Sequence, residues 1–256
     1  MNSQVMNEQL PAGYNRSGGG RFYELLVALL VTAMLVWFGY YLLDPTTLPI
    51  RQVRVEGEFR HLSTTGLQDL VRNRVRGGFF NINVKAVRDA VLIEPWVKSV
   101  SVHRVWPDGL QVFVKEQIAA ARWRDSALLN RNGELFTPDK DTFPDGLPLL
   151  SGPEGTHSLV MDRYLFLEEQ MSRVGLSVRQ LYMDDRRAWS LELGNGLSVV
   201  LGRKEFKQRV TRFVEVIPAR FGEKLDEAVK IDMRYTNGFA VRWKKELPDN
   251  SLAAGA

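Results

Sequence analysis

Residues 22–43, which read FYELLVALLVTAMLVWFGYYLL, contain a single charged residue, Glu24, near the start of the stretch. At about 1.5 Å of rise per residue, a helix of this length extends roughly 33 Å, which is enough to cross a hydrocarbon core of about 30 Å. No other stretch of the chain is comparably long and apolar. The sequence therefore predicts one transmembrane helix at 22–43, preceded by a short tail at 1–21 and followed by most of the chain.

The residues on either side of the span predict its orientation. The tail carries Arg16 and Arg21 against Glu8, and basic residues in short loops mark the cytoplasmic side of a membrane. Aromatic residues crowd the second half of the span, as in an interfacial belt: Trp37, Phe38, Tyr40 and Tyr41. We expect 1–21 to be a cytoplasmic tail and the body to lie outside. We also expect the span to be retained, because its apolar core is longer than that of a cleaved signal peptide.

Composition narrows the class of protein. Hydrophobic residues make up 45% of the chain and charged residues 25%, as in globular proteins, and the part beyond the span is long enough for one or two domains. The chain has no cysteine, which excludes disulfides, thiol catalysis and cysteine-ligated metals, and which fits a bacterial envelope protein. The net charge is only +4 and the basic residues are scattered, so we expect no nucleic-acid binding.

The region after the span has the pattern of a two-layer domain. A strand is predicted at 50–57, where apolar and polar residues alternate. Ser63 and Asn83 are placed to cap two helices with apolar stripes, and Pro95 ends the second helix. Two more alternating strands follow, joined by the turn sequence WPDG at 106–109. The order β-α-α-β-β predicts a three-stranded sheet that two helices cover on one face.

A family resemblance rests on this order and on the stretch at 95–116, PWVKSVSVHRVWPDGLQVFVKE. Both resemble the POTRA domain of the FtsQ/DivIB family of bacterial cell-division proteins, and its proteobacterial branch fits best. The resemblance extends from the span to about Trp243. It implies an α+β fold: one transmembrane helix, a POTRA domain at 48–117, and a mainly antiparallel β domain with flanking helices at 118–246. The last residues, 247–256, are predicted to form a disordered tail.

Beyond the POTRA-like region, the pattern predicts two helices among short strands. The helices are expected at 157–175 and at 204–217, and Pro218 is expected to limit the second. The proline-rich stretch at 138–153 is expected to be irregular. The last predicted hairpin, at 228–243, closes the domain.

No group of residues points to catalysis or to a metal site. His61, His103 and His157 are not spaced as helical ligand pairs and have no carboxylate at ligand spacing. The acidic pairs at 168–169 and 184–185 are neighbours in sequence, and neighbouring helical positions do not face each other. We therefore predict a protein that is not an enzyme, with no cofactor, no metal and no small-molecule substrate.

The remaining candidates are binding surfaces. Tyr235 and Trp243 lie on the predicted closing hairpin, either as core aromatics of the sheet or as anchors beside an exposed sheet edge. A tight turn at Asn237-Gly238 is expected to hold both aromatics rigidly. The resemblance favours the second alternative. It implies that the single-span partner FtsB, and through it FtsL, binds at four positions: Tyr235, Asn237, Gly238 and Trp243.

A second segment, DRRAW at 185–189, matches the part of the family that supplies an arginine to an acidic residue of that partner. The resemblance does not distinguish Arg186 from Arg187. The alternative for either arginine is a solvated charge, because exposed ion pairs contribute little.

A further basic cluster, RNRVRGG at 72–78 with Arg51 and Arg54, lies close to the predicted span. It could contact anionic lipid head groups. Acidic residues interrupt the cluster, which favours the alternative of a solvated helix face.

These patterns predict a cell division scaffold that spans the inner membrane once, with its N-terminus cytoplasmic and its C-terminus periplasmic, at the division septum. As the resemblance implies, it would link early and late division proteins by binding FtsB and FtsL through its β domain. The alternative is a POTRA-containing envelope protein for protein transport or outer-membrane assembly, a class with tandem POTRA modules and a membrane barrel. An envelope hydrolase, a third class, would need paired acids or a nucleophile–base pair in a pocket.

Overall fold

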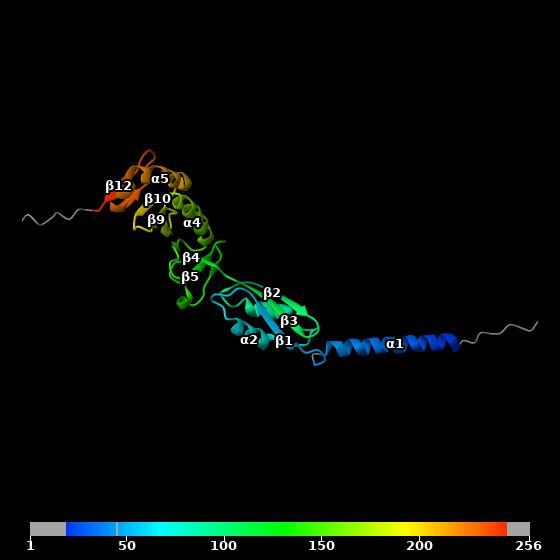
Figure 1. Cartoon of the computed structure of the whole chain (residues 1–256). Helices are drawn as coiled ribbons and strands as arrows, with labels where there is room; N and C mark the ends of the chain where they lie inside the picture. Colours follow the sequence, from blue (N-terminus) through cyan, green and yellow to red (C-terminus); the bar gives the residue numbers. More distant parts are fainter. Residues whose placement is uncertain (1–18, 45, 245–256) are drawn as a thin grey trace, which may run out of the picture.

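The computed structural model describes residues 19–44 and 46–244, so most of the predicted cytoplasmic tail and the predicted tail at 247–256 lie outside the described residues. Three parts follow one another along the chain: a long helix, a three-stranded sheet and a nine-stranded sheet (Figure 1). The helix, α1 (Gly19–Leu43), forms where the sequence predicts a span. Within it, Phe22–Leu42 is long and apolar enough to cross a membrane, and no part of this stretch is buried against the rest of the protein.

The three-stranded sheet has the predicted β-α-α-β-β order. Its elements are β1 (Gln52–Glu56), α2 (Thr64–Arg74), α3 (Val84–Val91), β2 (Val97–Val105) and β3 (Gly109–Glu116). The central strand β3 pairs in parallel with β1 and antiparallel with β2. As predicted, the side chains of Ser63 and Asn83 cap the two helices, accepting hydrogen bonds from the backbone N–H groups of Gly66 and Ala86.

Alternation along β3 determines which face of this small sheet packs against the helices. Val112 is completely buried, as are Val71 of α2 and Val87 of α3, and all three belong to one hydrophobic cluster. Val102 of β2 is only partly buried at the edge of that cluster. The two helices therefore cover one face of the sheet, and its other face remains open to solvent.

The nine-stranded sheet has the order β12-β11-β10-β9-β8-β7-β4-β5-β6. Its strands are β4 (Ala119–Trp123), β5 (Ala127–Asn130), β6 (Leu135–Phe136), β7 (Leu149–Ser151), β8 (Val178–Met183), β9 (Trp189–Leu193), β10 (Ser198–Gly202), β11 (Ala228–Asp232) and β12 (Ala240–Trp243). Five of the eight neighbouring pairs are antiparallel and three are parallel. The α+β fold class with a mainly antiparallel second sheet is therefore confirmed.

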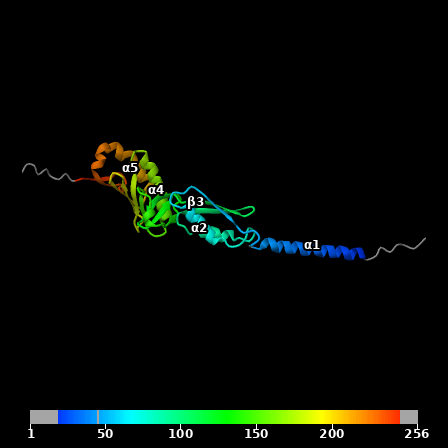
Figure 2. The same cartoon turned by 60° about the horizontal axis from the view of Figure 1, so that its bottom comes forward.

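Two helices, α4 (His157–Ser172) and α5 (Phe206–Phe221), pack on this sheet and contact each other. Figure 2 shows them together over the sheet. Their completely buried side chains include Met161, Leu167 and Phe213, which belong to the main core. Short 3₁₀ helices, η1 (Lys140–Thr142) and η2 (Gly222–Glu227), complete the domain.

Three expectations from the sequence are wrong in detail. The stretch at 138–153 contains β7, a strand in the middle of the sheet whose Leu150 is completely buried. Prolines on both sides leave this strand too short to show a period in the sequence. Pro218 does not end α5, which continues to Phe221. The proline removes one backbone N–H donor from the last turn, and that turn is held instead by Phe221, whose ring packs on Phe239 and on Trp243 of β12.

The third correction concerns the last hairpin. β11 and β12 pair antiparallel as predicted, but residues 233–239 all lie between them, so the connection is not a two-residue turn at Asn237-Gly238. The φ angle of Gly238 is not in the positive region, whereas that of Gly196, in the Asn195-Gly196 turn, is 83°. A type I′ turn needs positive φ at both central residues, and neither Asn-Gly pair meets that requirement, because only Gly196 has a positive φ.

A small aromatic cluster joins the two sheets. Trp96, just before β2, packs against Leu128 of β5 and Phe136 of β6. The indole N–H of Trp96 donates to Thr142 Oγ1 (3.1 Å), and the backbone N–H of Gln117 donates to the Trp96 carbonyl (2.8 Å). The β6 end of the large sheet is therefore packed against a residue of the three-stranded domain, and we call it the closed end, although among the described residues β6 has a neighbouring strand on one side only.

Candidate partner-binding surface

The opposite end of the large sheet is open. Within the described part of the chain, β12 has a neighbouring strand on one side only, namely β11. Along β12 the residues from Ala240 to Trp243 are exposed except for Val241, which is partly buried. An edge strand of this kind presents unpaired backbone N–H and C=O groups, to which an extended segment of another chain can add.

The two predicted aromatic anchors lie beside this edge and are not core residues. Tyr235 is 58% exposed and Trp243 is 41% exposed. The Trp243 ring packs edge-on against Phe221 of α5, with ring centroids 5.3 Å apart. Phe221 in turn packs against Phe239, which precedes β12 (5.9 Å). Trp243 is therefore supported from behind by an aromatic ring while much of its own surface stays available.

Arg212 of α5 positions the loop that carries Tyr235. Its guanidinium donates hydrogen bonds to three backbone carbonyls of the loop, those of Met233 (2.9 Å), Tyr235 (2.9 Å) and Thr236 (2.6 Å). A planar guanidinium with five donors suits several carbonyls at once. Arg212, and not a tight Asn-Gly turn, therefore fixes the backbone around Tyr235. The sequence showed Arg212 only as a polar position of an amphipathic helix.

The other two predicted loop residues follow this segment. Asn237 is exposed and Gly238 is partly buried. A side chain built on Gly238 would meet no atom within 4 Å, so the glycine is not required by close packing in the free protein. The structure places both residues in the connection between β11 and β12, next to Tyr235, and a role for either in binding stays a prediction.

Arg186 and Arg187 lie in the turn between β8 and β9, and both are exposed. The backbone of this turn is fixed by Asp184, whose carboxylate accepts from the N–H of Ala188 (2.7 Å). Arg187 has φ of 60°, in the left-handed region that few residues other than glycine adopt. The choice between the two arginines stays open.

Strand directions bring this turn and the β11–β12 loop to the same end of the sheet. β9 is antiparallel to both β8 and β10, and β10 is parallel to β11, so β8, β10 and β11 all end on the same side. Three strand spacings of about 4.8 Å separate the turn from the loop, roughly 14 Å. The exposed residues Arg203 and Lys204, which follow β10, lie between them.

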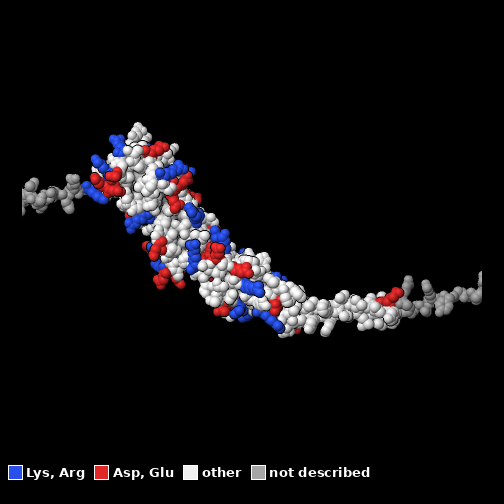
Figure 3. Space-filling view, in the orientation of Figure 1, with Lys and Arg blue, Asp and Glu red and all other residues white. Residues whose placement is uncertain are grey.

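This end of the sheet carries a row of basic groups, and of its acids only Asp185 is exposed and without a described ion pair. Asp232, at the end of β11, is held by the guanidinium of Arg234 at 2.6 Å. The hydrogen bond from Arg234 lowers the pKa of Asp232, although partial burial opposes the shift. Basic and acidic side chains are interspersed over the visible face of the domain (Figure 3). An extended segment with acidic side chains suits this end of the sheet better than a basic one.

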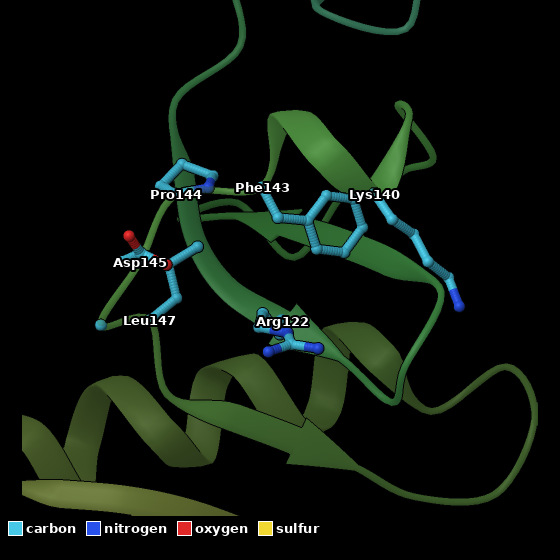
Figure 4. A pocket seen from close by; sticks show the side chains of 7 residues that line it. Arg122, Lys140, Phe143, Pro144, Asp145 and Leu147 are labelled. Atoms are coloured by element: carbon cyan, nitrogen blue, oxygen red, sulfur yellow. The ribbon is translucent and has the colours of Figure 1, made fainter.

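One pocket, of about 230 Å³, is lined by Arg122, Lys140 and the segment 143–147 (Figure 4). Arg122 lies across the Phe143 ring at 5.8 Å, so its charge is already partly engaged. The pocket holds no nucleophile–base pair and is open to solvent. Among the described residues, no group of three His, Cys, Asp or Glu side chains could hold a metal ion.

Comparisons with known proteins match both folded parts of the chain. The family model "POTRA domain, FtsQ-type" matches residues 48–117, and "Cell division protein FtsQ/DivIB, C-terminal" matches residues 121–234. The second match ends before Tyr235, so it does not include the loop tip or β12.

Similar proteins come from several bacteria. The chain is 36% identical to the cell division protein FtsQ of Coxiella burnetii over 201 residues, which cover 78% of this chain and 83% of the relative. It is 33% identical to FtsQ of Methylomonas methanica over 232 residues, covering 88% and 91%. It is 35% identical to FtsQ of Xanthomonas campestris over 228 residues, covering 89% and 80%.

Proposed function

Because this chain belongs to the FtsQ/DivIB family of cell division proteins, we propose that it is a non-enzymatic scaffold that links early and late division proteins at the septum. The family was predicted from the sequence and is confirmed. The relatives are named as division proteins, which goes against the alternative of an envelope transport factor. The observation that carries the proposal is the open strand β12 with exposed aromatics beside it.

In this proposal FtsB adds a strand to β12 and brings FtsL with it. Backbone hydrogen bonds along 240–243 would supply affinity, and Trp243 and Tyr235 would supply anchors. Both aromatics have few rotatable bonds and are supported by the protein, so they lose little entropy on binding. Arg212 supports Tyr235 through the loop backbone, and Phe221 supports Trp243 through its ring.

Arg186 or Arg187 would add an ion pair with an acidic residue of FtsB. Both are exposed and lie at the end of the sheet where the β11–β12 loop also lies. An exposed charge at the rim acts through screened electrostatics. We therefore expect Arg186→Glu or Arg187→Glu to weaken binding more at low salt than at high salt.

Calorimetry with full-length protein and a peptide from FtsB tests the anchors. Trp243→Ala and Tyr235→Ala should each weaken binding by about 2 kcal/mol, roughly thirtyfold, while the melting temperature changes little. Trp106→Ala is the matched control, because Trp106 is also an exposed aromatic but belongs to the other sheet. Normal binding by both anchor variants would place the FtsB surface elsewhere. A large drop in melting temperature would show that these side chains act as core.

The membrane orientation is part of the same proposal. α1 spans the inner membrane once, the tail before it is cytoplasmic, and both sheets lie in the periplasm, where FtsB presents its outer segment. A reporter that works only in the periplasm should be active when fused after Ala256 and inactive when fused before Met1. The reverse pattern would overturn the orientation.

A further inference from the structure

We propose that the membrane-proximal end of the POTRA domain rests on the lipid surface, with Trp106 and Phe80 at the interface and nearby arginines on anionic head groups. The proposal needs only that α1 spans the membrane and does not depend on any division partner. It concerns three segments: the tether 44–52, the α2–α3 connection and the β2–β3 turn.

The tether between the membrane helix and the POTRA sheet is short. α1 ends at Leu43 and β1 begins at Gln52. A turn shortens the tether further, because the N–H of Thr47 donates to the Asp44 carbonyl (3.1 Å). With at most about 3.5 Å per residue, Leu48 cannot lie further than roughly 18 Å from the end of the span. The end of the domain that contacts the tether is therefore held near the membrane.

Both other segments are hydrogen-bonded directly to this tether. The N–H groups of Arg51 and Gln52 donate to the carbonyl of Asp108 in the β2–β3 turn, at 2.9 and 3.3 Å. On the other side, the N–H of Phe79 donates to the Leu48 carbonyl at 2.8 Å. Pro49 also forms a bridge with Gly78. The β2–β3 turn and the α2–α3 connection are thus fixed on either side of the chain that leaves the membrane.

The β2–β3 turn and the α2–α3 connection each expose an aromatic side chain, although the Phe80 ring also packs edge-on against Phe79. Trp106 is 75% exposed at the tip of the turn, beside the exposed Val105. Phe80 is 44% exposed, whereas its neighbour Phe79 is buried. In both cartoon views the tip of the β2–β3 hairpin lies beside the end of α1 (Figures 1 and 2). Tryptophan is enriched at membrane interfaces, because its apolar ring can enter the lipid while its N–H stays in contact with water.

Basic residues surround the two aromatics. Four exposed arginines lie in or next to these segments: Arg51, Arg54, Arg76 and Arg104. None of the four takes part in an ion pair among the described residues, although Arg104 donates to the Ile82 carbonyl (2.9 Å) and Arg54 to Gln52 Oε1 (3.4 Å). Three acids lie in or next to the same segments: Glu56 accepts a hydrogen bond from Gln111, Asp44 accepts from Thr46, and Asp108 is part of the β2–β3 turn. The pattern of exposed aromatics flanked by unpaired arginines matches a surface of anionic lipid.

Depth measurements on single labels test the contact. The chain has no cysteine, so Trp106→Cys, Phe80→Cys and the control Ile118→Cys each provide one site for an environment-sensitive fluorophore. Ile118 is also highly exposed, but it follows β3 at the far end of the domain. The full-length protein is placed in nanodiscs of phosphatidylethanolamine and phosphatidylglycerol that contain head-group spin-labelled lipid. Labels at 106 and 80 should be quenched several-fold more than the label at 118. Equal quenching at all three positions would overturn the proposal.

A fourth label reports on the span itself. Val31→Cys lies in the middle of α1 and should be quenched by lipids that are spin-labelled deep in the acyl chain. Quenching at 31 without quenching at 106 and 80 would show that α1 spans the membrane but that the POTRA domain does not touch the lipid. That result would contradict the proposal and leave the membrane span intact. Melting curves of each labelled variant confirm that the domain is folded.

The charge requirement is tested separately in the Trp106→Cys background. Arg51→Glu with Arg54→Glu should reduce quenching at 106, and so should replacement of the anionic lipid by phosphatidylcholine. Lys224→Glu, an exposed charge of the β domain, is the matched control and should change nothing. Quenching that is the same in neutral and anionic nanodiscs would rule out anionic lipid as the ligand of this surface.

Discussion

The two ends of the nine-stranded sheet differ in how far their aromatic side chains are buried. At the β6 end, Phe136 is buried under Trp96 of the neighbouring domain, and Trp96 itself is only 5% exposed. At the β12 end, a four-residue strand is exposed along most of its length, and the nearest tryptophan, Trp243, keeps 41% of its surface accessible. An unpaired edge is an aggregation hazard that proteins cover or keep short. Both end strands are short, but only the β6 end is packed against the protein's own neighbouring domain.

The difference separates structural aromatics from binding aromatics. Trp96 satisfies both its N–H and its carbonyl within the chain, through Thr142 and Gln117. Trp243 contacts one supporting ring, and its indole N–H has no partner among the described side-chain hydrogen bonds. A buried side chain whose polar groups are hydrogen-bonded within the protein, such as Trp96, contributes to folding. An exposed side chain that packs on one neighbouring ring, such as Trp243, is available to a binding partner. Three substitutions, taken from the largest expected effect to the smallest, test that separation.

Trp96→Ala should have the largest effect. Removing a buried tryptophan leaves a cavity and typically costs 3–5 kcal/mol, so we expect a large loss of stability. Because the ring joins the two sheets, the two domains should also stop melting together. Calorimetric and circular dichroism melts of the full-length protein measure both effects.

Trp106→Ala is the control for that substitution, because it removes an equally large side chain that is 75% exposed. Its melting curve should match that of the unaltered protein to within about 0.5 kcal/mol. If Trp96→Ala also melted normally, the closed end would not depend on this ring and the contrast between the two ends would be lost.

Arg212→Ala should have an intermediate effect, confined to the open end. The variant loses three hydrogen bonds to the 233–236 backbone, in a region that water can partly reach, so we expect a loss of about 1–2 kcal/mol. Hydrogen exchange of the backbone amides in 233–239 should accelerate, while exchange around Trp96 should not change. FtsB binding should weaken through loss of loop order, although Arg212 itself would contact no partner.

Arg212→Lys serves as the conservative comparison. A lysine keeps the charge, but its three donors radiate from one nitrogen and lack the planar fork with which the guanidinium reaches carbonyls at different places along the loop. It should behave like the alanine variant in hydrogen exchange. Full protection with lysine at 212 would show that charge alone orders the loop.

Much of the fold was predictable from the sequence because local patterns agree with the tertiary structure. Ser63 and Asn83 cap helices as their positions predict, and alternation identified β1, β2 and β3. The family and the α+β class followed from that order of elements. Patterns failed where packing outweighs local preference: β7 is three residues long, and α5 runs past Pro218 because Phe221 has aromatic partners.

The candidate site was predictable only in part. The sequence located Tyr235 and Trp243 but could not tell core from surface, because an alternating strand next to an edge has the same pattern as one in the middle of a sheet. It assigned rigidity to Asn237-Gly238, whereas the rigid contact comes from Arg212, which is distant in sequence. The sequence also did not predict the contact between the two domains at Trp96, because such a contact produces no periodic pattern of apolar residues.

The smallest predicted effect is a pH dependence at the closed end, and it rests on Glu116. Its carboxylate accepts hydrogen bonds from the backbone N–H groups of Arg60 (2.8 Å) and His61 (3.1 Å), and the His61 ring lies 2.8 Å away and stacks on Trp96. Burial raises the pKa of Glu116, but these contacts outweigh burial and leave the pKa below its ordinary value of 4.5.

The sign of the effect follows from that direction. Below pH 4.5 the unfolded chain binds a proton at Glu116 more readily than the folded protein does, so stability falls as the pH falls. The contribution of the carboxylate is complete above pH 4.5 and is lost as the pH passes through the lowered pKa. Glu116→Gln cannot ionise, so its melting temperature should lie below that of the unaltered protein at pH 7 and approach it at about pH 3.

Asp232→Asn provides the comparison from the open end, since the pKa of Asp232 is lowered by Arg234 and the shift has the same sign. Asp232 lies in the hairpin that forms the open end, whereas Glu116 lies where two domains meet. Loss of the Glu116 carboxylate should therefore also separate the melting of the two domains in acid, and loss of the Asp232 carboxylate should not. The same effect of both variants on domain coupling would contradict this prediction. It would show that Glu116 contributes no more to the contact between the domains than Asp232 does.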